Sequence, residues 1–203
     1  MNQIIHRHFI LYKPFGYLSQ FVNNQTKRTN KKLLGQLFDF PERTMAIGRL
    51  DEKSEGLLLL TTDGKTSDLI TGKKIEKEYY VQLDGDIDAG TISKLASGID
   101  ISIPAVKSGS GIKKYHTKPC KVFKINEVPS FPERSKKIRD ERHGPTSWIS
   151  ITLTEGKFRQ IRKMTSAVGY PTLRLVRFRI GNIFLNDLKT GQLIEKSSLI
   201  DIV

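Results

Sequence analysis

Short apolar stretches recur along the whole chain, and their spacing predicts more strands than helices. Most run for about four to eight residues and are bounded by glycine, proline or aspartate, which is typical of strands. The run from Leu57 to Thr61 is apolar enough for a buried strand, and the Asp63-Gly64 turn closes it. We predict strands at residues 9–12, 44–48, 57–61, 77–85, 121–128, 148–153 and 172–181.

Four other segments space their apolar residues as a helix does. We predict helices at residues 31–38, 66–71, 87–98 and 157–169. Pro41 follows the first of them, and Gly98 and Gly169 stand where the third and fourth end. Strands dominate and the helices interrupt them without a βαβα rhythm. We therefore predict an α+β fold built on a mainly antiparallel sheet with flanking helices.

One long segment, residues 129–147, shows neither period. It reads "PSFPERSKKIRDERHGPTS" and contains three prolines and a cluster of basic side chains. A loop of this length inside a compact domain is usually functional or disordered. We expect it to serve binding.

Length and cysteine content narrow the class of protein. The 203 residues are enough to bury one core, so we expect a single domain over residues 1–203. The single cysteine, Cys120, excludes an intrachain disulfide framework and fits a reducing cytoplasm. No apolar run approaches the roughly 20 residues that span a bilayer. We expect a soluble cytoplasmic protein with no membrane partner.

The charge balance favours a polyanionic partner. The chain has 34 Lys and Arg against 21 Asp and Glu, a net charge of +13. Residues 113–179 hold 17 of the basic and five of the acidic side chains, so this segment carries +12. Such clustering favours nucleic acid over a generally basic surface.

Familiar metal and cofactor patterns are absent from the sequence. One cysteine and four histidines offer no CxxC and no HExxH, and the pair His6 and His8 fits solvent-exposed side chains better than ligands. No glycine-rich nucleotide loop and no GxSxG is present. We expect neither a metal nor a cofactor, which leaves carboxylates, tyrosines and arginines as candidates for chemistry.

Three residues stand out among these candidates, and each has a plainer alternative. In extended backbone Asp51 and Arg49 face one way while Leu50 faces the core, but Asp51 also fits a turn or cap residue. Tyr79 lies on the apolar face of its predicted strand, as a core tyrosine would. Arg162 fits a solvated helix face. Spacing alone does not choose between these interpretations.

Four motifs in order resemble those of a known family. They are "KPFG" (13–16), "GRLDEKSEGLLLLTTDG" (48–64), "KEYYV" (77–81) and "EGKFRQIRKM" (155–164). The chain resembles the RNA pseudouridine synthases of the branch that modifies ribosomal RNA. The similarity covers essentially the whole chain and is strongest to the E-type synthases, which act on large-subunit (23S) ribosomal RNA.

The resemblance implies an enzyme that isomerises uridine to pseudouridine, on a fold of two halves that meet at a central cleft. It implies that Asp51 is the catalytic aspartate, that Tyr79 is the motif tyrosine and that Arg162 is the basic residue paired with the aspartate. This redox-neutral reaction consumes nothing, which agrees with the missing cofactor motifs. The alternative is a non-catalytic RNA-binding or ribosome-assembly protein that retains the fold.

The first motif begins at Lys13, so we expect no separate N-terminal RNA-binding domain. We expect the catalytic domain to bind ribosomal RNA or a pre-ribosomal particle by itself, as a monomer. A flipped-out uridine would leave a space that Arg49 could fill. The residues predicted to contact RNA are Lys13, Arg49, Lys136, Lys137, Arg139, Arg142, Arg159 and Lys163.

Overall fold

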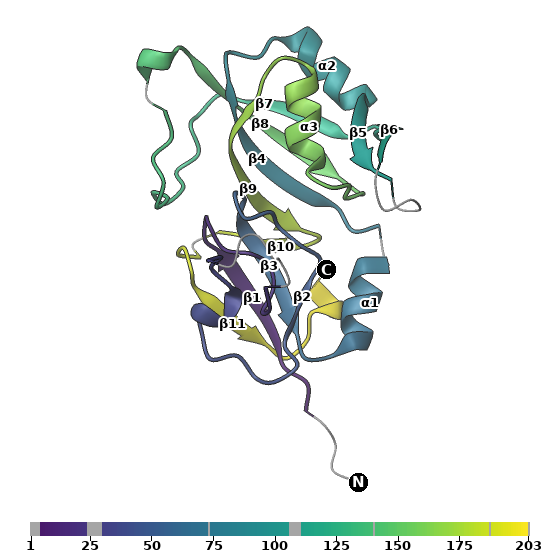
Figure 1. Ribbon diagram of the computed structural model, residues 1–203, viewed down its shortest axis with the longest axis vertical. Coiled ribbons are helices and arrows are strands. Elements are labelled where there is room, and N and C mark those ends of the chain that lie inside the picture. The colour runs from purple at the N-terminus through teal and green to yellow at the C-terminus, as the bar shows by residue number, and fades with distance from the viewer. Residues whose placement is uncertain are drawn as a thin grey trace. The chain divides into compact units, whose positions relative to one another are not determined.

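The computed structural model describes residues 5–23, 30–72, 74–105, 111–139, 141–186 and 188–202, and the chain forms two compact units (Figure 1). Unit 1 consists of Met1–Ile75, Pro132–Lys136 and Val176–Val203. Unit 2 consists of Glu76–Phe131 and Lys137–Leu175. The assignment of one catalytic domain to all 203 residues stays a prediction.

Unit 1 is built on antiparallel strands. Its elements are β1 (His8–Lys13), β2 (Met45–Ile47), β3 (Glu55–Thr61), α1 (Gly64–Gly72), β10 (Ile183–Phe184), β11 (Leu193–Lys196) and 3-10 helices at Leu34–Gln36 and Ile200–Ile202. Strand β1 lies between β11 and β3, and β2 pairs with Leu59, Leu60 and Thr61 on the other edge of β3. Phe9, Leu11, Leu34, Leu58 and Leu60 form a core on one face, because alternate strand residues point the same way.

Unit 2 is a sheet with helices on one face (Figure 1). Its elements are β4 (Lys77–Asp84), α2 (Ala89–Ser97), β5 (Asp100–Pro104), β6 (Ile112–His116), β7 (Lys121–Ile125), a 3-10 helix at Glu141–His143, β8 (Thr146–Leu153) and α3 (Gln160–Ala167). Strand β8 pairs antiparallel with β4 and β7, and β5 pairs antiparallel with β6. Val81 and Ile149 of the sheet meet Leu95 of α2 and Met164 of α3 in one fully buried core.

Strand β9 (Thr172–Ile180) belongs to both units. Its first residues lie in unit 2, where it neighbours β4, and its later residues run parallel to β3 in unit 1. The parallel pairing brings Gly56 (φ +102°) so close that a Cβ there would lie 2.3 Å from the Arg177 carbonyl oxygen. One parallel pairing among antiparallel ones makes the arrangement mixed, and the predicted α+β class is confirmed.

The predicted helix at 31–38 is wrong. Only Leu34–Gln36 coils, as a 3-10 turn. Backbone groups at its N-terminal end bond instead to the segment that follows β1: Leu18 N donates to Lys32 O, and Leu34 N donates to Gln20 O. A helix of about two turns is marginal alone, so these non-local hydrogen bonds decide the conformation.

Two further differences lie in unit 2. The predicted helix at 157–169 begins only at Gln160, because Arg159 has a left-handed backbone conformation (φ +53°). Strands β5 and β6, which pair with each other, were not predicted from the sequence. The helix predicted at 87–98 is confirmed as α2, which Gly98 ends with a positive φ of 95°.

Across the part of the chain with assigned positions, no helix is long and apolar enough to cross a membrane.

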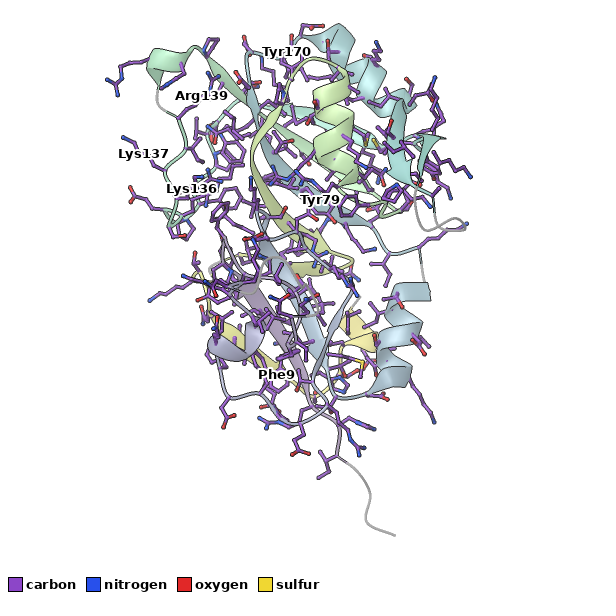
Figure 2. All side chains as sticks on the ribbon, viewed as in Figure 1. Phe9, Tyr79, Lys136, Lys137, Arg139 and Tyr170 are labelled. Atoms are coloured by element: carbon purple, nitrogen blue, oxygen red, sulfur yellow. The ribbon has the colours of Figure 1, made fainter. Side chains whose placement is uncertain are left out.

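The loop at 129–147 is fastened at two points of unit 2. The Phe131 ring lies 5.8 Å from that of Tyr80 and 5.9 Å from that of Trp148, and Arg174 lies over it at 5.5 Å. Further along the loop, the Arg139 guanidinium forms an ion pair with Asp84. Figure 2 shows Lys136, Lys137 and Arg139 along this loop.

Candidate active site

Asp51 stands in a turn between β2 and β3 whose backbone is fixed on both sides. The Ser19 hydroxyl donates to Leu50 O and accepts from Leu50 N, both at 2.9 Å. Ser54 N donates to Asp51 O at 3.0 Å, and Gly16 N donates to Glu52 O at 2.8 Å. The Gly16–Glu52 hydrogen bond therefore joins the backbones of the first and second motifs.

The side chains of this turn alternate as the sequence predicts. Leu50 is buried, with 6% of its surface exposed, while Arg49 is exposed and Asp51 is half-buried. Arg49 is thus available to a ligand. The Asp51 carboxylate stands at the boundary between the interior of unit 1 and solvent.

Charged side chains are buried in unit 1, and the charges of two of them and of Asp51 act on the pKa of a third, Lys13. Lys13, Glu55 and Arg177 are each exposed by 2% or less. The Lys13 ammonium donates to the carbonyls of Pro14 (2.9 Å) and Tyr17 (2.8 Å). Burial lowers the pKa of Lys13 to about 7, an effect that Glu55 and then Asp51 oppose and that Arg177 strengthens.

Lys13 was predicted to contact RNA, and the structure contradicts this. Its side chain has no exposed surface, because the last residue of β1 lies opposite Gly56 of β3 and its ammonium is bound by backbone carbonyls. Lys13 instead interacts electrostatically with the Asp51 carboxylate, which raises the pKa of the lysine. Arg177 and Ser19 were not predicted to belong to the site; the arginines inside the otherwise apolar strand β9 were the available signal for Arg177.

Tyr79 and Arg162 belong to unit 2. Tyr79, labelled in Figure 2, lies on β4 opposite Ile151 of β8 and packs half-buried against the apolar core. Arg162 is half-buried on α3, and its guanidinium donates to Thr172 O at 3.4 Å. The solvated-face interpretation of Arg162 therefore does not hold. The ion pair between Asp51 and Arg162 stays a prediction.

The other basic residues predicted to contact RNA differ in their exposure to solvent. Lys136, Lys137, Arg142 and Arg159 are exposed. Arg139 is engaged with Asp84 and donates to the carbonyls of His143 and Pro145, so it fixes the loop. Lys163 is half-buried and donates to Ser102 O of β5.

Besides Asp51, the described residues include a thiol and side chains of the types that bind metals. Burial raises the pKa of the Cys120 thiol to about 11, so the thiolate is scarce at neutral pH. Among the residues with assigned positions, no three His, Cys, Asp or Glu side chains gather closely enough to hold a metal ion. The backbone around Asp51 is fixed and its side chain is half-buried, which makes its carboxylate a candidate for acid–base or nucleophilic chemistry.

Comparisons with known proteins converge on one family. The sequence model described as RNA pseudouridylate synthase matches residues 7–167. "Ribosomal large subunit pseudouridine synthase E" of Xanthomonas campestris pv. campestris is 38% identical, over 90% of this chain and 91% of that protein. The protein of the same description from Vibrio parahaemolyticus is also 38% identical, over 90% of this chain and 71% of that protein.

A solved structure of this family has a similar fold. The one described as "Crystal structure of pseudouridylate synthase" superposes with a TM-score of 0.69 at 26% identity, and the match covers 94% of this chain and 70% of that one.

Proposed function

The chain belongs to the RNA pseudouridylate synthase family, and we propose that it isomerises one specific uridine of large-subunit (23S) ribosomal RNA to pseudouridine. The observation that carries the proposal is the fixed turn around Asp51 within a chain similar to large-subunit pseudouridine synthases over 90% of its length. The target uridine would be flipped out of its stack to reach Asp51.

The reaction rearranges bonds without a net change in composition. The N1–C1′ bond of uridine breaks, the uracil turns, and a C5–C1′ bond forms. The proton leaves C5 and N1 ends protonated. A carboxylate can assist as a nucleophile at C1′ or at the uracil ring, or by promoting a glycal-like intermediate. We assign this role to Asp51, and the reaction as written requires neither metal nor cofactor.

Tyr79 and Arg162 complete the proposed machinery. A tyrosine has a flat face that can stack on uracil and a hydroxyl that can exchange a proton with the sugar. The guanidinium of Arg162 does not titrate near neutral pH and can bind both oxygens of a carboxylate. We propose that it keeps Asp51 ionised when substrate excludes water.

RNA binding is assigned to exposed cations. Lys136, Lys137, Arg142 and Arg159 would contact phosphates, and Arg49 would occupy the space that the flipped base vacates. Phosphate contacts supply affinity rather than sequence reading. We expect the protein to act in the cytoplasm, as a monomer, on ribosomal RNA or a pre-ribosomal particle.

Asp51→Asn tests the assignment of the carboxylate. The substitution keeps the size of the side chain and removes its charge and nucleophilicity. We expect release of tritium from RNA labelled at uridine C5 to fall by about 10⁴-fold or more, with RNA affinity and thermal unfolding unchanged. Asp68→Asn, at an exposed position of α1, is the matched control and should retain full turnover.

The outcome also separates the enzyme from its rival. If Asp51→Asn turns over at the wild-type rate, the catalytic assignment is wrong. If the wild-type protein binds ribosomal RNA but releases no tritium from any fragment, a non-catalytic RNA-binding or ribosome-assembly role replaces the enzyme.

A further inference from the structure

Three exposed side chains follow one another just before α3. Lys157, Phe158 and Arg159 all face solvent, and Phe158 keeps 60% of its surface exposed. A single exposed apolar residue is common on protein surfaces and needs no explanation. What distinguishes Phe158 is the way its turn is built and the charges around it.

The turn is held by a polar network that leaves little freedom. The Glu155 carboxylate accepts from the Tyr115 hydroxyl (2.5 Å), from Lys118 N (3.0 Å) and from Gln160 Nε2 (2.6 Å). The other side-chain atom of Gln160, Oε1, accepts from Lys157 N at 2.9 Å. Gln160 N also donates to Lys157 O at 3.0 Å. Both ends of the turn are thereby tied to each other and to β6.

Arg159 adds backbone strain to this rigid turn. Its φ of +53° places it in the left-handed region, which costs a side-chain-bearing residue free energy. The strained residue turns the chain just before α3 begins at Gln160. Strained, over-determined backbone tends to occur where a protein presents groups to a ligand.

Positive charge surrounds the two aromatic rings at the turn. The Lys163 ammonium lies 5.1 Å from the centre of the Phe158 ring, and the Lys157 ammonium lies 4.7 Å from that of Tyr115. Phe123 of β7 is as exposed, at 63%, but among the residues with assigned positions no cation lies over its ring. An apolar protein partner would have to bury these charges, whereas RNA neutralises them.

We propose that the turn Gly156–Arg159 is a nucleotide-binding site, in which Phe158 stacks on an unpaired base and Lys157 and Arg159 bind the adjoining phosphates. The ligand is a single-stranded segment of RNA, which rests on the proposed function. Aromatic rings bind any base through its π-face, and nearby cations follow the backbone. The network of Glu155 and Gln160 fixes the site in advance, which reduces the entropy lost on binding.

The test measures binding of a single-stranded oligouridylate to the full chain by fluorescence anisotropy. Phe158→Ala should weaken binding about 5- to 150-fold, the usual effect of removing one stacking ring, and Phe158→Tyr should restore it. Phe123→Ala is the control for loss of an equally exposed phenylalanine of unit 2 and should bind as the wild type does. Circular dichroism and thermal unfolding check that each variant folds.

Salt dependence separates stacking from charge. Phe158→Ala should lower affinity with the same slope of log Kd against log salt, whereas Lys157→Gln should make that slope smaller. The inference is overturned if Phe158→Ala binds like the wild type, if Phe123→Ala weakens binding equally, or if the wild-type protein does not bind the oligouridylate.

These outcomes are independent of the proposed catalytic activity. Weaker binding by Phe158→Ala in a protein that releases no tritium retains the site and removes the enzyme. Normal binding by Phe158→Ala in a protein that turns over removes the site and retains the enzyme.

Discussion

Lys13 is the residue whose environment differs most from its chemical type. A lysine usually keeps its ammonium in water, yet this one is fully buried at the end of β1, and two carbonyls bind it. Because three nearby carboxylates raise its pKa, burial lowers the value only to about 7. The group therefore gains or loses its charge close to neutral pH, beside the proposed catalytic aspartate.

The low pKa of Lys13 predicts a pH dependence of stability. An unfolded lysine has a pKa near 10.5, so between about 7 and 10.5 the folded protein binds fewer protons at this site than the unfolded chain. The contribution of Lys13 to the free energy of unfolding must then rise with pH across that interval. Below about pH 7 the full cost of burying the charge is present.

Denaturant unfolding of the wild type and of Lys13→Met between pH 6 and 10 measures this contribution. The difference between the two free energies of unfolding should shift in favour of the wild type as pH increases above about 7. Lys65→Met, at an exposed position of α1, controls for the loss of a lysine. A Lys13 difference that is flat or falls with pH would contradict the prediction.

At the scale of elements, a few side chains attach the loop at 129–147 to unit 2. Residues 129–139 of the loop form no strand, and the Phe131 ring and the Arg139 guanidinium attach this part to unit 2. The aromatic contacts of Phe131 should contribute about 1–3 kcal/mol to keeping this end in place. The exposed Lys136 and Lys137 lie between the two attachment points.

Phe131→Ala should detach the first end of the loop while the sheet of unit 2 stays folded. Trypsin cleaves after lysine, so the rate of cleavage at Lys136 and Lys137 should rise by about tenfold or more. Mass spectrometry of the fragments over time identifies the sites. Phe123→Ala removes an exposed ring of β7 and should leave the rate unchanged. Equal rates for both variants would show that Phe131 does not anchor the loop.

At the scale of the whole molecule, charge is distributed unevenly. Residues 113–179 carry nearly all of the net +13, and they include the exposed loop and the turn before α3. Cations that contact phosphates displace counterions, so affinity must fall as salt rises, with a slope set by the number of contacts. Within the loop, Lys136, Lys137 and Arg142 are the exposed candidates for phosphate contact, because Arg139 is engaged with Asp84.

Lys136→Gln with Lys137→Gln should weaken binding of a ribosomal RNA fragment and reduce the slope of log Kd against log salt by about two. The control is Lys65→Gln with Lys189→Gln, which removes the same charge at exposed positions outside residues 113–179. If the control pair changes the slope as much, net charge explains binding and the loop has no special part.

How far the sequence predicts the molecule depends on the range of the interactions involved. Apolar runs such as Leu57–Leu60 make strands from local spacing alone, and Gly98 ends α2 through its own φ. The helix predicted at 31–38 was wrong because the backbone partners of this segment, Leu18 and Gln20, are remote in sequence. The hairpin of β5 and β6 likewise depends on pairing across a gap in the chain.

The site divides in the same way. By itself the sequence determined the α+β class and the basic segment, and its motifs, through their family resemblance, pointed to Asp51 as the candidate carboxylate. Only the tertiary structure decided that Lys13 is buried, that Ser19 holds the backbone of Leu50, and that Glu155 and Gln160 fix a turn exposing Phe158. Local spacing determines which face a residue takes, whereas burial and hydrogen-bond partners depend on the residues that folding brings alongside.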